Sequence, residues 1–314
     1  MSDPTYRSLV AGEFHLFNRY VPTSTSGVGA RSRTFDEYVA AGHYRHDWVW
    51  VAQRSDEVLA RVAFWAPPEY AQPFSVDFFD PGTDLDVGAE LLRAAYAALV
   101  TEPYDMPTGN DRPDYHLFLP ADWRDHPDAM ADANDRITAA EKAGLRFFVE
   151  RVNLRWTPER GLPARSTRLR FGPATDDELV VDVLMRLCEN SLDSYAARDV
   201  ERYGPRRAAE VTIEETLEMG GRDWWRLAYD GDGSVVGITL PVRATDFATH
   251  AYVGVVPEHR GHHYSEDLVV ETLHIFTEAG ESLVHDATDV ANAPMAAAFE
   301  RVGYEITGRR VVML

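Results

Sequence analysis

The sequence has 314 residues, more than one hydrophobic core usually organises, so two domains of about 150 residues each are expected. Apolar residues form 45% and charged residues 26% of the chain, as in ordinary globular proteins, which argues against a disordered or a membrane-spanning protein. Because 51 Asp and Glu outnumber 31 Lys and Arg, the net charge is −20, and we expect neither nucleic acid nor a membrane as a partner.

The N-terminus and the cysteine content both favour a cytoplasmic protein. Residues 1–17 show no basic leader followed by an apolar stretch and a cleavage site of small residues, so we expect no export. The single cysteine, Cys188, cannot form a disulfide within the chain, and it has no Cys or His neighbour at a zinc-ligand spacing. Since it lies in an apolar, helix-like stretch, we expect a buried structural thiol and no metal site.

The first half of the chain predicts a hairpin followed by strands and helices. Two apolar strands around a polar turn span Trp48 to Trp65. A further strand, a loop with Pro and Gly and a helix-period stretch follow within residues 74–100. A short strand, a helix, Gly144 and a closing strand complete this half. The alternation of strands and helices predicts an α/β fold.

The second half repeats this order of elements. A hairpin from Trp224 to Val242 turns at the sequence DGDG, and a strand, a Gly-containing loop, a helix and a closing segment around Gly303 follow. Because Gly144 and Gly303 take matching places, we expect two tandem copies of one α/β fold. The predicted domains are residues 1–158 and 167–314, joined by a linker over residues 159–166 that is rich in Pro, Gly, Arg and Ser.

The most informative stretch is VVPEHRGHHYSEDLV, which begins at Val255. A strand ends at Pro257, and a short turn with Arg260 and Gly261 leads directly into a helix pattern. Unpaired N–H groups at the start of a helix form an anion site, and an arginine can add bidentate phosphate contacts. The residues alone fit a plain strand-to-helix connection equally well.

The wording VxPEHRG resembles the acyl-CoA loop of the GNAT superfamily of acyltransferases. The resemblance implies that Val255 and Val256 contact the pantetheine arm of acyl-CoA. It implies that the following turn holds the pyrophosphate. The residues of that turn are Arg260, Gly261, His262, His263, Tyr264 and Ser265. The family's second glycine is His263 here, where a side chain would crowd the pyrophosphate or require a positive φ, and its final Gly or Ala is Ser265, which can cap a helix.

A second motif, TDVANAPMAAAFERVGY, resembles the last motif of the same family. By that resemblance Asn292 contacts CoA, and Phe299 lies where many members carry the tyrosine that protonates the departing thiolate. The two motifs cover Val255 to Tyr304 and imply a tandem GNAT protein with a degenerate N-terminal copy. Each copy would have a mixed, mostly antiparallel central sheet flanked by helices.

Amide formation needs a base that receives the ammonium proton. The sequence offers His250 and Tyr252 on the strand before the loop, and Glu189 or Asp193 beside the preceding helix. Each of these residues also has an ordinary structural interpretation. On that interpretation His250 is a solvated histidine, Tyr252 is a packed ring, and the two acids belong to a solvent-exposed helix face.

The matching loop of the first half reads FFDPGTDLDVG. Asp80, Asp84 and Asp86 would place like charge beside a pyrophosphate, so we expect this copy not to bind CoA.

The leading hypothesis is an N-acyltransferase that moves an acyl group, most simply acetyl from acetyl-CoA, to a primary amine of a small molecule. One alternative is a non-catalytic module that binds acyl-CoA or another ligand, and another is an N-acetyltransferase of protein N-termini or lysines. A monomer or a homodimer is expected.

Overall fold

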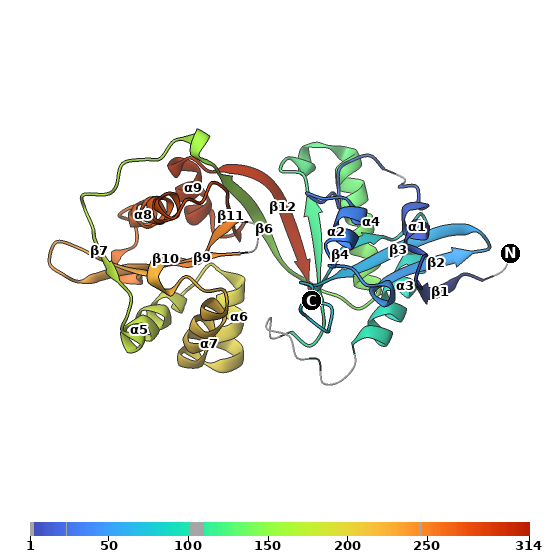
Figure 1. Cartoon of the computed structure of the whole chain (residues 1–314), viewed down its shortest axis with the longest axis horizontal. Coiled ribbons are helices and arrows are strands. Elements are labelled where there is room, and N and C mark those ends of the chain that lie inside the picture. Colours follow the sequence, from blue (N-terminus) through green and yellow to red (C-terminus); the bar gives the residue numbers. More distant parts are fainter. Residues whose placement is uncertain (1–2, 23, 101–103, 105–109, 245–246) are drawn as a thin grey trace. The chain divides into compact units, whose positions relative to one another are not determined.

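The computed structural model divides the chain into two units that do not follow the order of the sequence (Figure 1). It describes residues 3–22, 24–100, 104, 110–244 and 247–314. Unit 1 consists of Met1–Glu150 together with Gly308–Leu314, and unit 2 of Arg151–Thr307. The last residues of the chain therefore complete the first unit.

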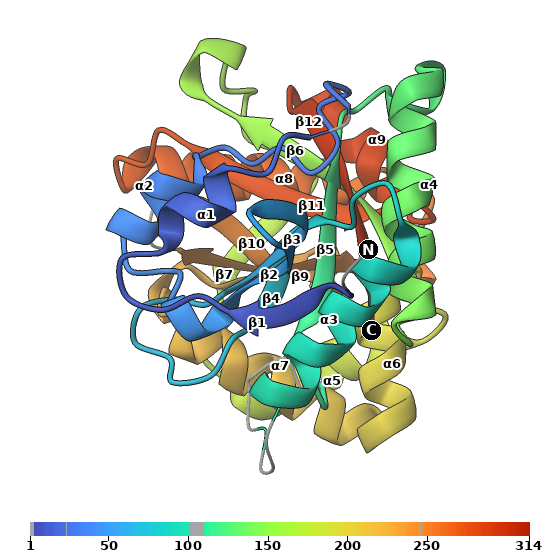
Figure 2. The ribbon, with the colours of Figure 1, turned by 90° about the vertical axis from the view of Figure 1, so that its right-hand side faces the viewer.

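Unit 1 is a sheet with the order β1-β2-β3-β4-β5-β12, in which β4 and β5 run parallel and the other neighbours antiparallel. Helices α1 and α2 cover one face, and α3 and α4 cover the other (Figure 2). The elements are β1 (Thr5–Ser8), α1 (Phe14–Asn18), α2 (Phe35–Ala40), β2 (Val49–Arg54), β3 (Glu57–Trp65), β4 (Ser75–Asp80), α3 (Leu85–Leu99), β5 (Asp114–Leu119), α4 (Pro127–Lys142) and β12 (Glu305–Met313).

Unit 2 has the matching order β7-β8-β9-β10-β11-β6, with β10 and β11 parallel. Helices α5, α6 and α7 lie on one face of this sheet, and α8 and α9 on the other (Figure 1). The elements are β6 (Phe147–Trp156), β7 (Arg170–Pro173), α5 (Asp177–Cys188), α6 (Ser194–Tyr203), α7 (Pro205–Glu218), β8 (Arg226–Tyr229), β9 (Val235–Arg243), β10 (Ala248–Val255), α8 (Tyr264–Glu278), β11 (Val284–Asp289) and α9 (Ala293–Val302).

The two copies exchange their last strands. Strand β6 follows α4 along the chain, but its residues 151–156 pair with β11 of unit 2. Strand β12 follows α9, but its residues 309–313 pair with β5 of unit 1. Each sheet is thus completed by the strand that ends the other copy.

The predicted fold class is confirmed, because both units are α/β with mostly antiparallel sheets. The two predicted hairpins are β2–β3 and β8–β9. The boundaries at residues 158 and 167 stay a prediction about the two repeats of the sequence, since the units are defined by spatial contacts. Sequence reasoning did not anticipate the strand exchange.

Helix α3 shows how local sequence places an element. Asp84 caps its start by accepting a hydrogen bond from the N–H of Asp86, and apolar residues at helical spacing pack on the sheet. Those buried residues are Val87, Leu91, Leu92 and Ala95. None of the helices in the described residues is long and apolar enough to cross a membrane.

Strand β5 carries an unusual buried histidine. The His116 side chain is 17% exposed, and its Nε2 atom lies 3.7 Å from Asp114 Oδ2. Burial lowers the pKa of His116 to about 4, although the neighbouring Asp114 carboxylate acts in the opposite direction. His116 therefore stays neutral in the folded protein at neutral pH.

We expect His116 to make the protein sensitive to mild acid. In the unfolded chain the imidazole protonates as the pH falls through about 6.5, whereas the folded protein takes up that proton only near pH 4. The free energy of unfolding should fall over this window by up to about 3 kcal/mol more than in a His116→Gln variant. Urea titrations of both proteins at several pH values would measure it, and parallel pH curves would contradict the assignment.

Candidate functional site

The candidate site of unit 2 lies where two parallel strands separate. Strands β10 and β11 pair only at Ala248 and Val284 within the described residues and then diverge, which leaves the facing backbone edge of β10 without a partner strand. A cavity of about 580 Å³ opens along this wedge. It is bordered by β10, the turn before α8, the starts of α8 and α9, β11, and residues 190–193 after α5.

The turn before α8 has the features of an anion site. Gly261 has φ +84° with no atom near its missing side chain, and α8 is a helix of 15 residues. Within the described part of the chain, the backbone N–H groups of residues 261–265 have no hydrogen-bond partner. Free amides at the positive end of a helix dipole are suited to a pyrophosphate.

His263 adopts the strained conformation that the sequence led us to expect. Its φ is +59° and its ψ is 23°, a left-handed conformation that glycine adopts more easily. The ring Nδ1 atom lies 2.9 Å from Glu266 Oε1, and Arg301 Nε donates to the same oxygen at 2.6 Å. The turn therefore carries a histidine where the family has a glycine, and side-chain contacts hold it there.

Arg260 is used differently from the expectation. Its Nε donates to the Val255 carbonyl at 3.2 Å, and its two terminal nitrogens donate to the carbonyls of Leu187 (3.2 Å) and Glu189 (3.4 Å). The guanidinium thereby links the turn to the end of α5 and positions the loop. Because its nitrogens already donate to carbonyls, it does not offer a free pair of N–H donors to a phosphate. Its side chain still lines the cavity.

The structure brings most of the predicted cofactor residues to the cavity. Val255, Arg260, Gly261, His263, Tyr264, Ser265, Asn292 and Phe299 line it. Val256 does not, because it is fully buried and its N–H donates to the Val236 carbonyl of β9. His262 also lies away from the cavity lining: its ring stacks on Tyr264, and its carbonyl accepts from Arg168.

Three of the predicted bases line the cavity and one does not. His250, Tyr252 and Asp193 line it, whereas Glu189 caps the end of α5 with an exposed side chain. Tyr252 packs in the core beside α5, and burial raises the pKa of its phenol. Burial likewise raises the pKa of the neighbouring Cys188 thiol. Tyr252 is therefore protonated at neutral pH and unsuited to act as a base.

His250 forms a dyad with Asp286 near the point where the strands separate. Asp286 Oδ2 lies 3.1 Å from His250 Nδ1, and its Oδ1 accepts the His250 backbone N–H at 2.8 Å. Burial would raise the pKa of Asp286, but the adjacent His250 lowers it below its ordinary value. Because an ionised carboxylate only accepts, the proton of His250 sits on Nδ1 and Nε2 is left as an acceptor.

The free nitrogen of this dyad is buried. The His250 side chain is 2% exposed, and its ring meets the edges of Phe276 and Phe299. Nε2 has no hydrogen-bond partner among the described residues. The arrangement is that of an oriented imidazole with one unused lone pair at a cavity wall.

The cavity wall also carries charged groups, of which the sequence suggested only Asp193. Arg151 of β6 lines it, with Nε 3.4 Å from Asp289 Oδ1 and one terminal nitrogen 3.8 Å from Asp193 Oδ2. Burial, followed by the charge of Asp193, raises the pKa of Asp289. Arg151 gave no signal in the sequence, since it precedes the linker and reaches unit 2 only through the exchanged strand. Groups of three or more metal-ligand side chains do not occur in the described residues.

The corresponding wedge of unit 1 is filled by the chain itself. Strands β4 and β5 pair at Ser75–Asp114 and Val76–Tyr115 and then diverge. The Gly29 N–H donates to the Phe118 carbonyl of β5 at 2.7 Å, and Arg136 of α4 donates to the Phe79 carbonyl of β4. These contacts occupy backbone groups that an intruding ligand would need.

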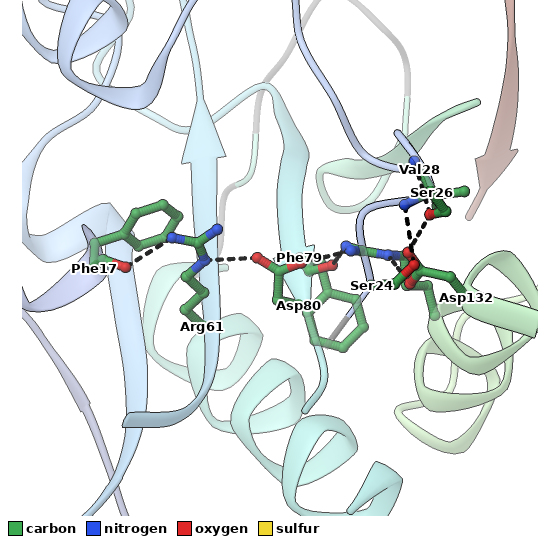
Figure 3. Close-up of polar contacts among 9 residues, drawn as sticks. Phe17, Ser24, Ser26, Val28, Arg61, Phe79, Asp80 and Asp132 are labelled. Atoms are coloured by element: carbon green, nitrogen blue, oxygen red, sulfur yellow. Dashed lines mark hydrogen bonds and ion pairs between the residues drawn. The ribbon is translucent and has the colours of Figure 1, made fainter. Parts of the chain in front are cut away.

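Buried charges complete this plug. Arg136 pairs with Asp80 at 2.6 Å and with Asp132 at 2.9 Å, and Ser26 donates to Asp132 at 2.7 Å (Figure 3). Burial would raise the pKa of Asp80, but Arg136 and Arg61 lower it. Arg136 lies eight residues before Gly144. Met295, which lines the cavity of unit 2, lies eight residues before Gly303, so the two residues take corresponding places in the two copies.

Solved structures with a similar fold include N-acetyltransferases. A GCN5-related N-acetyltransferase from Sphaerobacter thermophilus is 14% identical, with a TM-score of 0.60 over 99% of this chain and 94% of its own. A tandem GNAT protein from the clavulanic acid biosynthesis pathway is 16% identical, with a TM-score of 0.50 over 99% and 98%. A glucosamine N-acetyltransferase region of a fungal multi-domain β-N-acetylglucosaminidase is 14% identical, with a TM-score of 0.52 over 100% of this chain and 38% of that one.

No protein-family model matches the sequence, and no curated protein matches it either. The structural likeness at these identities establishes the fold. The expected tandem GNAT fold is confirmed.

We expect each chain to bind one molecule of acetyl-CoA. The wedge of unit 2 is open and has free amides, whereas the wedge of unit 1 is occupied by Gly29 and Arg136. Isothermal titration calorimetry of the full chain should give a molar ratio near one. A ratio near two would show that the plug of unit 1 opens.

Replacing His263 with glycine should tighten acetyl-CoA binding. The change relieves a left-handed conformation that costs about 1 kcal/mol and removes a side chain beside the free amides. His262→Ala is the matched control, because that histidine lies outside the cavity lining. Weaker binding by His263→Gly at an unchanged melting temperature would mean that the His263 ring itself contacts the ligand.

Proposed function

We propose that this protein is an acyl-CoA-dependent N-acyltransferase, most simply an acetyltransferase, that acts on a primary amine of a small molecule in the cytoplasm. The observation that carries the proposal is the combination in unit 2 of an open wedge, free amides at the start of α8 and a buried His250–Asp286 dyad at the same cavity. The fold shared with GNAT N-acetyltransferases supports it.

The residues present fit acyl-CoA. The free N–H groups of residues 261–265 would hold its pyrophosphate, and the unpaired edge of β10 would hold its pantetheine arm. Asn292 and Phe299 line the same cavity from the start and the middle of α9. When bound, acyl-CoA supplies the activated acyl group as a thioester.

His250 is the base in this proposal. An amine is protonated at neutral pH and attacks a carbonyl only after it loses a proton. Nε2 of His250 receives that proton, and the resulting imidazolium is stabilised by the Asp286 carboxylate beside Nδ1. Asp286 is a positioning residue, since it holds the ring orientation and the tautomer through two hydrogen bonds.

The departing thiolate receives no help from α9. Phe299 has no hydroxyl, so the proton donor must come from water or from a phenol on another element. Tyr252 and Tyr264 are the phenols that line the cavity, and the raised pKa of Tyr252 keeps it protonated and able to donate.

Asp193 and Arg151 at the far end of the cavity would select the acceptor. The two carboxylates of Asp193 and Asp289 face one guanidinium, an arrangement that favours a cationic ligand. The net charge of −20 would also attract an amine toward the protein.

The proposal is tested by transfer from acetyl-CoA to a panel of small primary amines, measured as free thiol released and as acetylated product. We expect turnover with at least one amine in the panel. Acetyl-CoA binding without transfer to any amine, even in a single turnover, would favour the non-catalytic module. Transfer to peptides alone would favour a protein acetyltransferase.

His250→Gln should lower kcat by about 100-fold or more, and Asp286→Asn by less, because general bases contribute about 10²–10⁴-fold. Acetyl-CoA affinity should hold in both variants. His285→Gln is the control, since this histidine lies next to Asp286 on β11 but outside the cavity lining. Equal activity of His250→Gln and His285→Gln would remove His250 from the mechanism.

A further inference from the structure

Unit 1 retains a hollow beside its closed wedge. This hollow has a volume of about 360 Å³ and lies between the α1–α2 segment, β3 and β4. Its walls include three arginines, Arg31, Arg33 and Arg61, and three phenylalanines, Phe17, Phe35 and Phe78. Three arginines at one hollow are notable in a chain of net charge −20.

Arg31 is held rigidly at this hollow. Its guanidinium lies 4.0 Å from the ring centre of Phe118 and 5.3 Å from that of Tyr38, and its Nη2 atom pairs with Asp77 Oδ2 at 3.1 Å. Nε and Nη1 have no hydrogen-bond partner among the residues that the structure describes. The side chain is only 14% exposed, so these donors are fixed and partly desolvated.

Arg61 is fixed in a similar way (Figure 3). Its Nε donates to Asp80 at 2.6 Å, its Nη1 donates to the Phe17 carbonyl at 2.8 Å, and its guanidinium lies 4.4 Å from the Phe17 ring centre. Its Nη2 has no partner in the described part of the chain. Both arginines therefore have N–H donors that remain free after their contacts within the described protein are made.

The nearby carboxylates are already engaged. Asp77 accepts from Tyr44 at 2.7 Å besides pairing with Arg31, and Asp80 is shared between Arg61 and Arg136. The Glu37 carboxylate accepts the N–H and the hydroxyl of Thr34, where it completes a capping box. The two buried carboxylates beside this hollow are thus paired with arginines, and the remaining guanidinium donors of Arg31 and Arg61 stay available.

We propose that the hollow of unit 1 binds a small organic anion, with its carboxylate or phosphate on Arg31 and Arg61 and its apolar body against the phenylalanines. Fixed planar guanidinium groups are the preferred partners of such oxyanions, and aromatic walls favour a ligand that also has an apolar part. The site is independent of the acyltransferase function proposed for unit 2.

The two units carry different charged groups at matching positions of the fold. Counted from the first paired residues of each wedge, Asp77 and His116 of unit 1 take the places of His250 and Asp286 of unit 2. The carboxylate that replaces His250 is bound to Arg31, a wall residue of the hollow. Unit 1 thus carries an anion-binding arginine where unit 2 carries a proton-accepting dyad.

The test is calorimetric titration of the full chain with benzoate and with phenyl phosphate, both without CoA and with saturating CoA. We expect binding with a dissociation constant of about 1 mM or below for at least one of them, and none for benzylamine, which has the opposite charge. Absence of binding by both anions at millimolar concentration would overturn the proposal. Binding that CoA abolishes would place the anion in unit 2 and overturn it as well.

A charge placed at the rim should block the hollow without disturbing the core. Ser32 is exposed, and its hydroxyl lies 3.4 Å from the Tyr38 hydroxyl beside Arg31, so the carboxylate of Ser32→Asp can occupy the free donors. We expect at least about tenfold weaker anion binding at an unchanged melting temperature. The control is Arg93→Gln, which removes an exposed arginine from α3. Equal anion affinity in Ser32→Asp and in the parent would refute the assignment.

Discussion

In both units two parallel strands pair at their start and then separate, and the backbone groups along the separated edges need partners. A buried N–H or C=O left without one costs about 1–3 kcal/mol. In unit 1 the Gly29 N–H and the Arg136 guanidinium supply those partners, and buried ion pairs hold them in place. In unit 2 the edge of β10 faces a cavity of about 580 Å³. One constraint of the fold therefore yields a closed core in one copy and an open cavity in the other.

The charged groups of the two copies have diverged along with their wedges. Unit 2 has a histidine on β10 and an aspartate on β11, 3.1 Å apart, with an unused nitrogen at the cavity wall. Unit 1 has an aspartate on β4 and a histidine on β5 at the matching places, and neither is paired with the other in the described structure. Asp77 is bound to Arg31, and His116 is neutral. The histidine and the aspartate thus stand on opposite strands in the two units, and only in unit 2 does the aspartate orient the histidine.

The order of elements and the two motifs that resemble the GNAT superfamily predicted the fold and the turn before α8, because the turn depends on residues close together in the chain. They also suggested His250, Asn292 and Phe299 as site residues, and all three line the cavity. The sequence also predicted the positive φ of His263. Features that depend on distant pairing were missed. The direction of Arg260 is set by where α5 ends, and Val256 is buried by its register with β9. The composition of the linker carries no sign of the strand exchange that brings Arg151 to unit 2.

The exchange of β6 and β12 also fixes the order in which the protein can mature. Strand β5 obtains its neighbour β12 from Gly308–Leu314, which a ribosome adds only after all of unit 2 has been synthesised. Until then β5 has an open hydrogen-bonding edge beside the apolar row of Tyr115, Leu117 and Leu119, which is a template for pairing with other chains. The first half of the nascent chain therefore cannot complete its sheet until the second half has been synthesised. A chain stalled or cleaved before Gly308 would leave the edge of β5 unpaired, so truncated products of this protein would be prone to aggregate.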